Sequence, residues 1–344
     1  MTLGADEFLN VYDQIEGVIL EDLAVDVIPQ ETIQWIKNLM SSTVPKGKYF
    51  RSKIVVDTFS ILRGRDLTPE EFKEAYTVGW AIEFFQASCL IADDIMDEST
   101  MRRGAPCRHL QPGVGMIAIN DLLFLESTAY HIIKHYFRKK PYYTKILELC
   151  HDMTWKTEIG QLTDSLFAQK AHEDVESVTM KDYEMIAVYK CGYYTFYTPI
   201  AVAMLLAGEE REDAFELARE LVLPLSEVYQ VQDDYLDCFG DPKVSGKIGT
   251  DIQDNKATWL SIKARELATP EQRALLKANY GRKDQKCIDL VKSIYRDLDI
   301  PGHYAAYEEK TCQEIKKRIL ASDSSLLPHR VILAYMERIY GRDM

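Results

Sequence analysis

Apolar residues recur at spacings of three and four positions through most of the chain, which is the pattern of amphipathic helices. This periodicity predicts helices over residues 8–23, 33–39, 53–62, 69–96, 120–136, 143–167, 180–206, 212–238, 258–266, 270–278 and 287–298. Breaks fall at clusters of Pro and Gly, for example at 45–47, 104–106 and 240–242. Alternating strand patterns are scarce, and no segment has the composition of a linker. We therefore expect an all-α fold in which residues 1–344 form a single domain.

Two sets of acidic residues lie within this apolar pattern, about 140 residues apart, and each has the form D-D-x-x-D. They comprise Asp93, Asp94, Asp97, Asp233, Asp234 and Asp237. In a helix, the first and last carboxylates of each set lie one turn apart on the same face. Buried carboxylates repel one another, and a hard cation such as Mg²⁺, which shares its remaining positions with water and phosphates, removes that cost. The pattern predicts two acidic helices that face a central cavity and bind a diphosphate through metal; the alternative is a solvated acidic surface.

A diphosphate site also needs cations, and basic residues stand beside the acidic sets or near glycines. They are Lys48, Arg51, Arg102, Arg103, Lys190, Lys247 and Lys256. The pair Arg102 and Arg103 follows the first set directly, and the planar guanidinium binds phosphate oxygens with two parallel hydrogen bonds. Taken singly, each lysine would be an ordinary surface residue.

Composition narrows the class of protein. The net charge of −13 argues against nucleic acid or an anionic membrane as a partner. No apolar run approaches the roughly 18 residues of a membrane span, and residues 1–36 contain acids but no Lys or Arg, unlike a secretory or mitochondrial leader. Seven cysteines without paired spacing are typical of reduced thiols. We expect a cytoplasmic protein.

The acidic sets and their neighbours resemble the trans-prenyl diphosphate synthase family. Residues 90–97, followed by Arg102, Arg103 and Gly104, are similar to the family's first aspartate-rich motif. Residues 229–237 closely resemble the second motif of eukaryotic farnesyl diphosphate synthases, and the similarity continues through 239–242 and 246–256 over nearly the whole chain. The animal members of that group are the most similar in pattern. The resemblance implies an isoprenoid synthase-type helical bundle, a Mg²⁺-dependent reaction on an allylic prenyl diphosphate, and a homodimer.

The resemblance also implies a role for each site residue. Three Mg²⁺ ions, or Mn²⁺ in their place, would be bound by Asp93, Asp97 and Asp233, with support from Asp94, Asp164, Asp234 and Asp237. The allylic diphosphate would be held by Arg102, Lys190 and Lys247, with Lys256 beside them, and isopentenyl diphosphate by Lys48, Arg51, Gln86 and Arg103. The carbonyl of Lys190 and the side chain of Gln230 would stabilise the carbocation.

The sequence departs from the family pattern one helical turn before Asp93. Animal farnesyl diphosphate synthases usually carry two aromatic residues there, whereas this chain has Ser88 and Cys89. Four residues of helix rise about 6 Å, comparable to one isoprene unit, so the loss of these rings would admit a longer or a folded product. Alternatively, Phe124 from a neighbouring helix rebuilds the floor of the product cavity.

Other functions remain open on sequence alone. Some insect members of the family have become terpene synthases, which cyclise the cation without a second substrate; the basic residues around Lys48 argue against that alternative. A catalytically silent partner subunit would lack acids in one set, and both sets are complete here. His131 and His135 have metal-binding spacing, but with no acid nearby along the sequence we interpret them as a surface helix face.

Overall fold

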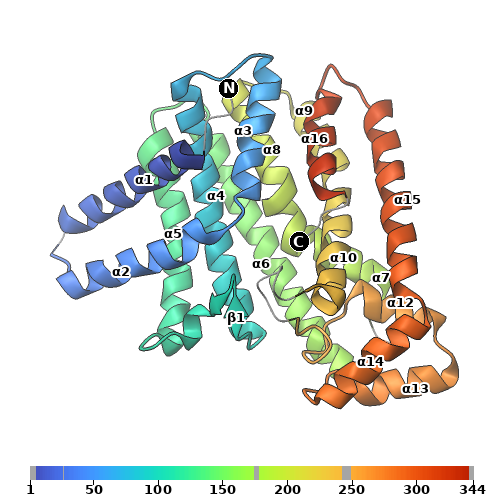
Figure 1. Ribbon diagram of the computed structural model, residues 1–344. Coiled ribbons are helices and arrows are strands. Elements are labelled where there is room, and N and C mark those ends of the chain that lie inside the picture. The colour runs from blue at the N-terminus through green and yellow to red at the C-terminus, as the bar shows by residue number, and fades with distance from the viewer. Residues whose placement is uncertain (1–4, 26, 174–177, 242–248, 341–344) are drawn as a thin grey trace. The chain divides into compact units, whose positions relative to one another are not determined.

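The computed structural model describes residues 5–25, 27–173, 178–241 and 249–340, and nearly all of its regular elements are helices (Figure 1). The predicted all-α fold is confirmed. Internal contacts divide the chain into two compact units. Unit 1 comprises Met1–Asp152 and Thr198–Ala214, and unit 2 comprises Met153–Tyr197 and Phe215–Met344. That residues 1–344 act as one domain around a central cavity stays a prediction. None of the helices within the described ranges is long and apolar enough to cross a membrane.

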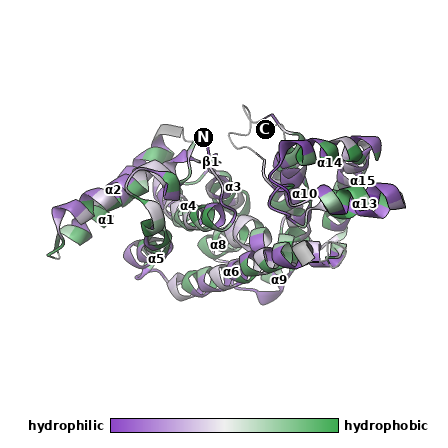
Figure 2. Ribbon diagram, turned by 90° about the horizontal axis from the view of Figure 1, so that it is seen from below, coloured by the Kyte–Doolittle hydropathy of each residue, from purple (hydrophilic) through white to green (hydrophobic). Residues whose placement is uncertain are grey.

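Unit 1 is built around one long helix, α4. Its helices are α1 (Ala5–Val25), α2 (Gln30–Thr43), α3 (Phe50–Arg63), α4 (Pro69–Met96), α5 (Ala118–Phe137), the start of α6 (Tyr143–Glu173) and α8 (Thr198–Ala207), with 3₁₀ turns η1 (Val44–Lys46), η2 (Arg108–Leu110) and η3 (Gly115–Ile117). α4 packs against α1, α3, α5 and α8, so it is apolar on all sides over most of its length, as expected for a central helix. α8 carries mostly hydrophobic residues in Figure 2 and is buried from Thr198 to Leu206.

The two ends of α4 coincide with the bounds predicted from sequence. At the start, Thr68 accepts a hydrogen bond from the Glu71 backbone, the Glu71 side chain accepts one from the Thr68 backbone, and Pro69 stands in the first turn. At the other end, Asp97 caps the helix, and its N–H donates to the carbonyl of Asp93 at 2.9 Å. The helical turn that relates the outer aspartates of the first set is therefore preserved.

A short hairpin follows α4, although no strand was predicted there. β1 (Met101–Arg102) pairs antiparallel with β2 (Ala105–Pro106). The two residues of the turn, Arg103 and Gly104, have φ of 53° and 75°, and positive φ at both central positions is typical of tight hairpin turns. The hairpin reverses the chain, so that Arg102 lies back against α4.

Unit 2 contains the C-terminal helices. It includes α6 from Met153 onward, α7 (Met180–Ile186), η5 (Ala187–Tyr197), α10 (Pro224–Phe239), α12 (Trp259–Leu267), α13 (Pro270–Asn279), α14 (Gln285–Asp297), α15 (Ile300–Ala321) and α16 (His329–Ile339), while α9 (Glu212–Val222) crosses the boundary between units. α10 packs against η5, α12 and α15. The helices α15 and α16 were not predicted. Pro301 and Gly302 lie in the first turn of α15, and Pro328 is the N-cap of α16, so these residues begin the helices rather than separate them.

The stretch predicted as one helix over residues 180–206 has an internal change of winding. Between α7 and α8, η5 is a π-helix of 11 residues, a form that is rare and frequent at functional sites. α6 approaches η5 so closely that a Cβ on Gly160 would lie 2.1 Å from the backbone nitrogen of Lys190. Because Gly160 has no side chain, α6 and η5 can come this close, and this contact positions the backbone of Lys190.

Candidate active site

The first acidic set lies at the carboxyl end of α4 in unit 1. Asp93 and Asp97 are half-buried, whereas Asp94 is 2% exposed. Nη2 of Arg102 donates to Asp94 Oδ1 at 2.6 Å and to Asp93 Oδ2 at 3.1 Å. Burial raises the pKa of Asp94, and the positive charge of Arg102 opposes that rise. The structure thus brings Arg102 to the first set and places it between two of the aspartates.

The second acidic set lies on α10 in unit 2, and its middle member is again the buried one. Asp234 is 3% exposed and accepts hydrogen bonds from Tyr183 Oη at 2.7 Å and from the backbone N–H of Trp259 at 2.9 Å. Nε2 of Gln230 also donates to it, at 3.0 Å. Burial raises the pKa of Asp234, and these donors oppose the rise. Tyr183 and Trp259 were not among the predicted site residues, because nothing local in sequence marks them as partners of an aspartate.

The outer residues of the second set remain accessible. Asp233 and Asp237 are both half-buried. Oδ2 of Asp237 accepts a hydrogen bond from the backbone N–H of Asp251 at 3.1 Å. Next to it, a Cβ on Gly249 would lie 1.9 Å from the carbonyl oxygen of Asp237, so the chain can pass this close only with glycine at that position.

The two sets share one arrangement that fits a hard divalent cation. In each, the outer pair of carboxylates is half-buried, while the middle one is buried and bonded to protein donors. The accessible donors on these helices are oxygen atoms, which Mg²⁺ prefers. The oxygen donors present in each set therefore fit a hard cation such as Mg²⁺.

A third acidic residue, Asp164 on α6, binds two lysines of unit 2. Its Oδ2 accepts from Lys190 Nζ at 2.7 Å and from Lys256 Nζ at 2.8 Å. Burial would raise the pKa of this carboxyl, but the two lysines hold it below its ordinary value. Lys190 and Lys256 were predicted to bind substrate, and Asp164 was predicted to support the metal ions. In the structure, Asp164 binds both lysines. The remaining predicted lysine, Lys247, lies outside the described residues.

The residues predicted for the second substrate all belong to unit 1, and one of them, Arg103, lies near the buried acid Glu83. Arg51 and Gln86 are 8% and 7% exposed, and Oε1 of Gln86 has no hydrogen-bond partner among the residues described. Burial and the charges of Arg51 and Arg102 lower the pKa of Arg103, while Glu83 opposes the change. A bound anion would relieve the mutual repulsion of these three arginines.

Glu83, which was not predicted, organises this region. Its carboxylate accepts from the Oγ of Ser52 at 3.2 Å. Arg103 passes over Gly47, where a Cβ would stand 3.0 Å from Nη2 of Arg103 and 3.7 Å from Oε2 of Glu83. Lys48, the fourth predicted residue of this group, is exposed.

The residues predicted to set product length lie on α4 and α5, which pack against each other. Ser88 is 4% exposed, and its Oγ donates to the carbonyl of Phe85 at 2.7 Å. Cys89 is half-buried, and burial raises the pKa of its thiol to about 12. Phe124 on α5 is also half-buried. A thiol with so high a pKa stays neutral at neutral pH, so Cys89 is suited to apolar contact.

His131 and His135 are exposed on α5, which confirms the expected surface helix face, but the expectation that no acid lies near them is wrong. His131 and His135 do have an acid beside them, because Asp22 of α1 lies 2.8 Å from Nε2 of His131. The two histidines and the aspartate are 109 residues apart at their closest in sequence, so local spacing could not reveal the contact.

Comparison with known proteins places this helical, aspartate-rich chain among the prenyl-chain synthases. The family model "Polyprenyl synthetase" matches residues 33–298. The chain is 41% identical to the farnesyl pyrophosphate synthase of Candida albicans over 98% of this chain and 97% of that one. It is also 41% identical to the human farnesyl pyrophosphate synthase, over 98% of this chain and 80% of that one.

Solved structures agree with the sequence comparison. A farnesyl diphosphate synthase of T. brucei complexed with bisphosphonate matches with a TM-score of 0.90 and 30% identity, over 98% of this chain and 99% of that one. The chain belongs to the polyprenyl synthetase family. The resemblance predicted from the two acidic motifs is therefore confirmed, and animal farnesyl pyrophosphate synthases are among the relatives.

Proposed function

We propose that this protein is a trans-prenyltransferase that joins an allylic prenyl diphosphate to isopentenyl diphosphate. The observation that carries the proposal is the group of Arg51, Gln86 and Arg103 in unit 1, polar and cationic side chains that are present in addition to the cations beside the aspartates. A terpene synthase ionises a single diphosphate and needs no second anion pocket. The farnesyl pyrophosphate synthases to which the chain is similar support the same choice.

The acidic sets bind the metal ions that stabilise the departing diphosphate. Asp93, Asp97, Asp233 and Asp237 would hold Mg²⁺, or Mn²⁺ in its place, and three ions are expected. When bound, these ions withdraw charge from the leaving group. Asp94 and Asp234 hold the sets in shape, since both are buried and bonded to protein donors.

Basic side chains that lie beside carboxylates bind the substrate phosphates. Arg102 contacts the allylic diphosphate from its place beside the first set, and its planar group suits two phosphate oxygens. Lys190 and Lys256 both form ion pairs with Asp164, which orients their ammonium groups. Lys247, which lies outside the described residues, is proposed for the same diphosphate from the family resemblance alone.

Gln230 stabilises the allylic cation through its amide dipole, together with the carbonyl of Lys190. Asp234 accepts a hydrogen bond from Nε2 of Gln230. This bond directs the NH₂ end of the amide toward the carboxylate and leaves the carbonyl oxygen, the negative end of the dipole, for the cation. The second substrate attacks that cation through its double bond, and the released diphosphate takes the proton.

The reaction is tested by supplying substrates singly and in pairs. With Mg²⁺ and either geranyl or farnesyl diphosphate plus isopentenyl diphosphate, we expect a longer prenyl diphosphate by mass spectrometry. A hydrocarbon or alcohol formed from one allylic diphosphate alone would overturn the proposal.

Arg103→Gln should raise the KM for isopentenyl diphosphate and leave the KM for the allylic substrate nearly unchanged. Arg138→Gln, at an exposed position, is the matched control.

Product length is set by Ser88, Cys89 and Phe124. The two small residues replace bulk on α4, so we propose that the enzyme makes products beyond farnesyl diphosphate. Restoring bulk with Ser88→Phe and Cys89→Phe should shorten the product, and Phe124→Ala should lengthen it. An unchanged product distribution in both variants would show that the floor of the cavity lies elsewhere.

We also propose a homodimer that works in the cytoplasm. Trp155, Leu162 and Leu166 are 67%, 59% and 50% exposed and lie along one face of α6, and an apolar stripe of this kind is typical of an interface. All seven cysteines are free thiols, which suits a reducing compartment. Light scattering should give twice the chain mass, and Leu162→Asp should reduce it to the chain mass.

A further inference from the structure

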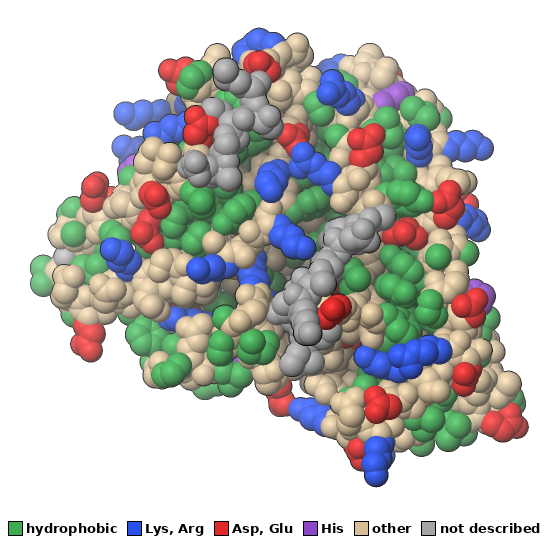
Figure 3. Space-filling view, in the orientation of Figure 1, with side chains coloured by type: hydrophobic (Ala, Val, Ile, Leu, Met, Phe, Trp, Pro, Cys, Tyr) green, Lys and Arg blue, Asp and Glu red, His purple; other side chains and the backbone are tan. Residues whose placement is uncertain are grey.

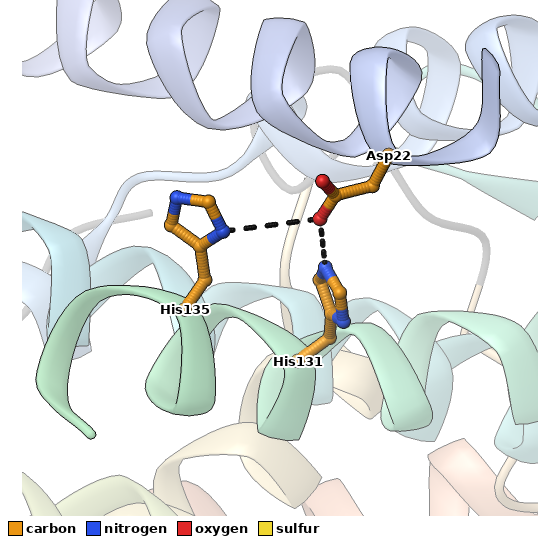
Figure 4. Close-up of side chains that lie close together, drawn as sticks. All are labelled: Asp22, His131 and His135. Atoms are coloured by element: carbon orange, nitrogen blue, oxygen red, sulfur yellow. Dashed lines mark hydrogen bonds and ion pairs between the residues drawn. The ribbon is translucent and has the colours of Figure 1, made fainter. Parts of the chain in front are cut away.

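Three side chains with metal-binding atoms meet on unit 1, and none belongs to the acidic sets. Asp22 comes from α1, and His131 and His135 come from successive turns of α5 (Figure 4). Both imidazoles point toward the same carboxylate oxygen, Oδ2 of Asp22, at 2.8 Å from His131 Nε2 and 3.8 Å from His135 Nδ1. The three ligand atoms lie within 4.8 Å of one another, and no other trio of His, Cys, Asp or Glu in the described part of the chain does so.

We propose that Asp22, His131 and His135 form a second metal site, which binds a borderline divalent cation such as Zn²⁺ or Co²⁺. Imidazole nitrogen is a preferred ligand of these cations, whereas Mg²⁺ prefers oxygen alone. Two nitrogens and one carboxylate therefore distinguish this site chemically from the two D-D-x-x-D sets. The donor set is also that of three-ligand zinc sites that keep a fourth position for water.

The distances suit such an ion after small side-chain adjustments. Ligand atoms about 2.0–2.1 Å from a tetrahedral ion stand roughly 3.3 Å apart. The two separations from Asp22, 2.8 Å and 3.8 Å, lie on either side of that value. All three side chains are between 40% and 45% exposed, so each can rotate by a few tenths of an ångström without disturbing the core, and water reaches the remaining position.

The site would join two helices that have other main neighbours. α1 packs chiefly against α2 and α4, and α5 packs chiefly against α4. An ion held between Asp22 and the two histidines would therefore add a direct link from the N-terminal helix to α5. Ligand binding to the folded state stabilises it by mass action, so the bound ion should protect α1 from local opening.

The alternative is that Asp22 and His131 form only an ordinary hydrogen-bonded pair. His135→Gln separates the two interpretations, because it keeps the 2.8 Å contact of His131 and removes one metal ligand. Asp22→Asn and the double variant His131→Gln, His135→Gln remove more of the site. His303→Gln on α15 is the matched control, because His303 is also exposed on a helix and belongs to unit 2.

The test uses the untagged full chain in excess Mg²⁺, which occupies the carboxylate sets. Calorimetric titration with Zn²⁺ should show one saturable site per chain in the wild type and in His303→Gln. We expect at least a tenfold loss of affinity in His135→Gln and no site in the double variant. Equal Zn²⁺ binding by wild type and double variant, or none by the wild type, would overturn the proposal.

Two further measurements locate the ion independently of turnover. Co²⁺ should give visible absorption bands of a nitrogen-ligated ion that disappear in the double variant. Zn²⁺ should slow hydrogen exchange over residues 5–25 and raise the Tm by a few degrees, and neither effect should occur in the double variant once circular dichroism shows it folded. Protection that persists in the folded double variant would assign the ion to another place and refute the site.

Discussion

The middle aspartate of each D-D-x-x-D set differs from its neighbours in environment. Asp94 and Asp234 are buried and bonded to Arg102 and to Tyr183, respectively, while the outer aspartates are half-buried. A motif of three identical residues thus contains two kinds of carboxylate. We interpret the middle residue as an anchor, because its lone pairs are engaged by the protein itself.

Substitution of an outer aspartate should therefore impair turnover more than folding. Asp93→Ala or Asp233→Ala removes a half-buried ligand and should lower kcat by several orders of magnitude, with a Tm close to that of the wild type. Asp234→Ala leaves two buried donors, Tyr183 Oη and the Trp259 N–H, without an acceptor, at a cost of about 1–3 kcal/mol each, and should lower the Tm clearly. Steady-state kinetics and thermal denaturation check both; full activity in Asp93→Ala would exclude the assigned ligand.

Asp164 gives a pH-dependent prediction. The two lysines lower its pKa, so its contribution to stability is present above the ordinary carboxyl pKa of about 3.9 and is lost as the pH falls through the lowered value. Asp164→Asn should cost about 2 kcal/mol at pH 7, less than the roughly 3–5 kcal/mol of a fully buried pair, because Lys190 keeps 23% exposure. Urea denaturation should show the gap between wild type and variant shrinking below pH 4; a gap that is constant with pH would contradict the ion-pair role.

At the scale of elements, periodicity predicted what depends on local sequence. The bounds of α4 were predicted to the residue, since capping at Thr68 and a run of helix-forming residues determine them. Periodicity did not predict the π-helix, nor the close approach of Gly160 on α6 to it, which only the tertiary fold reveals. The hairpin at Arg102 was also not predicted, because strands of two residues are too short to show an alternation of polar and apolar residues.

The approach of α6 to η5 is tested by adding one methyl group. In Gly160→Ala the new Cβ would lie 2.1 Å from the Lys190 nitrogen and 2.5 Å from its Cα. The two helices would have to separate, at a cost of at least about 1–3 kcal/mol, and Lys190 would be displaced with η5. We expect a lower Tm and a lower kcat.

Gly17→Ala on α1 is the matched control. A Cβ there meets nothing within 4 Å, so the exchange should stabilise the helix by about 0.5–1 kcal/mol. A Gly160→Ala variant as stable and active as Gly17→Ala would contradict the role of the close contact in positioning Lys190.

At the scale of the whole molecule, the residues that the sequence did not predict are those whose partners are remote in the chain. Glu83 meets Ser52, Tyr183 and Trp259 meet Asp234, and Asp22 meets His131. The type and spacing of the site residues were predictable, because a D-D-x-x-D set lies within one helix. Their bonding partners were not, because tertiary folding alone brings those partners to the sites.

These internal partners predict how the protein behaves without divalent metal. Arg102 offsets the charge of the first set, Lys190 and Lys256 offset Asp164, and backbone and side-chain donors engage Asp234. The carboxylates thus do not depend on metal to be tolerated in the fold. Chelation by EDTA should abolish turnover, leave the helical circular dichroism spectrum unchanged, and be reversed by Mg²⁺. The measurement is made on the His131→Gln, His135→Gln double variant, so that an ion bound between α1 and α5 does not affect the spectrum. Loss of helix on chelation there would show that metal at the aspartate sets is part of the folding of the protein, and that the internal cations are insufficient.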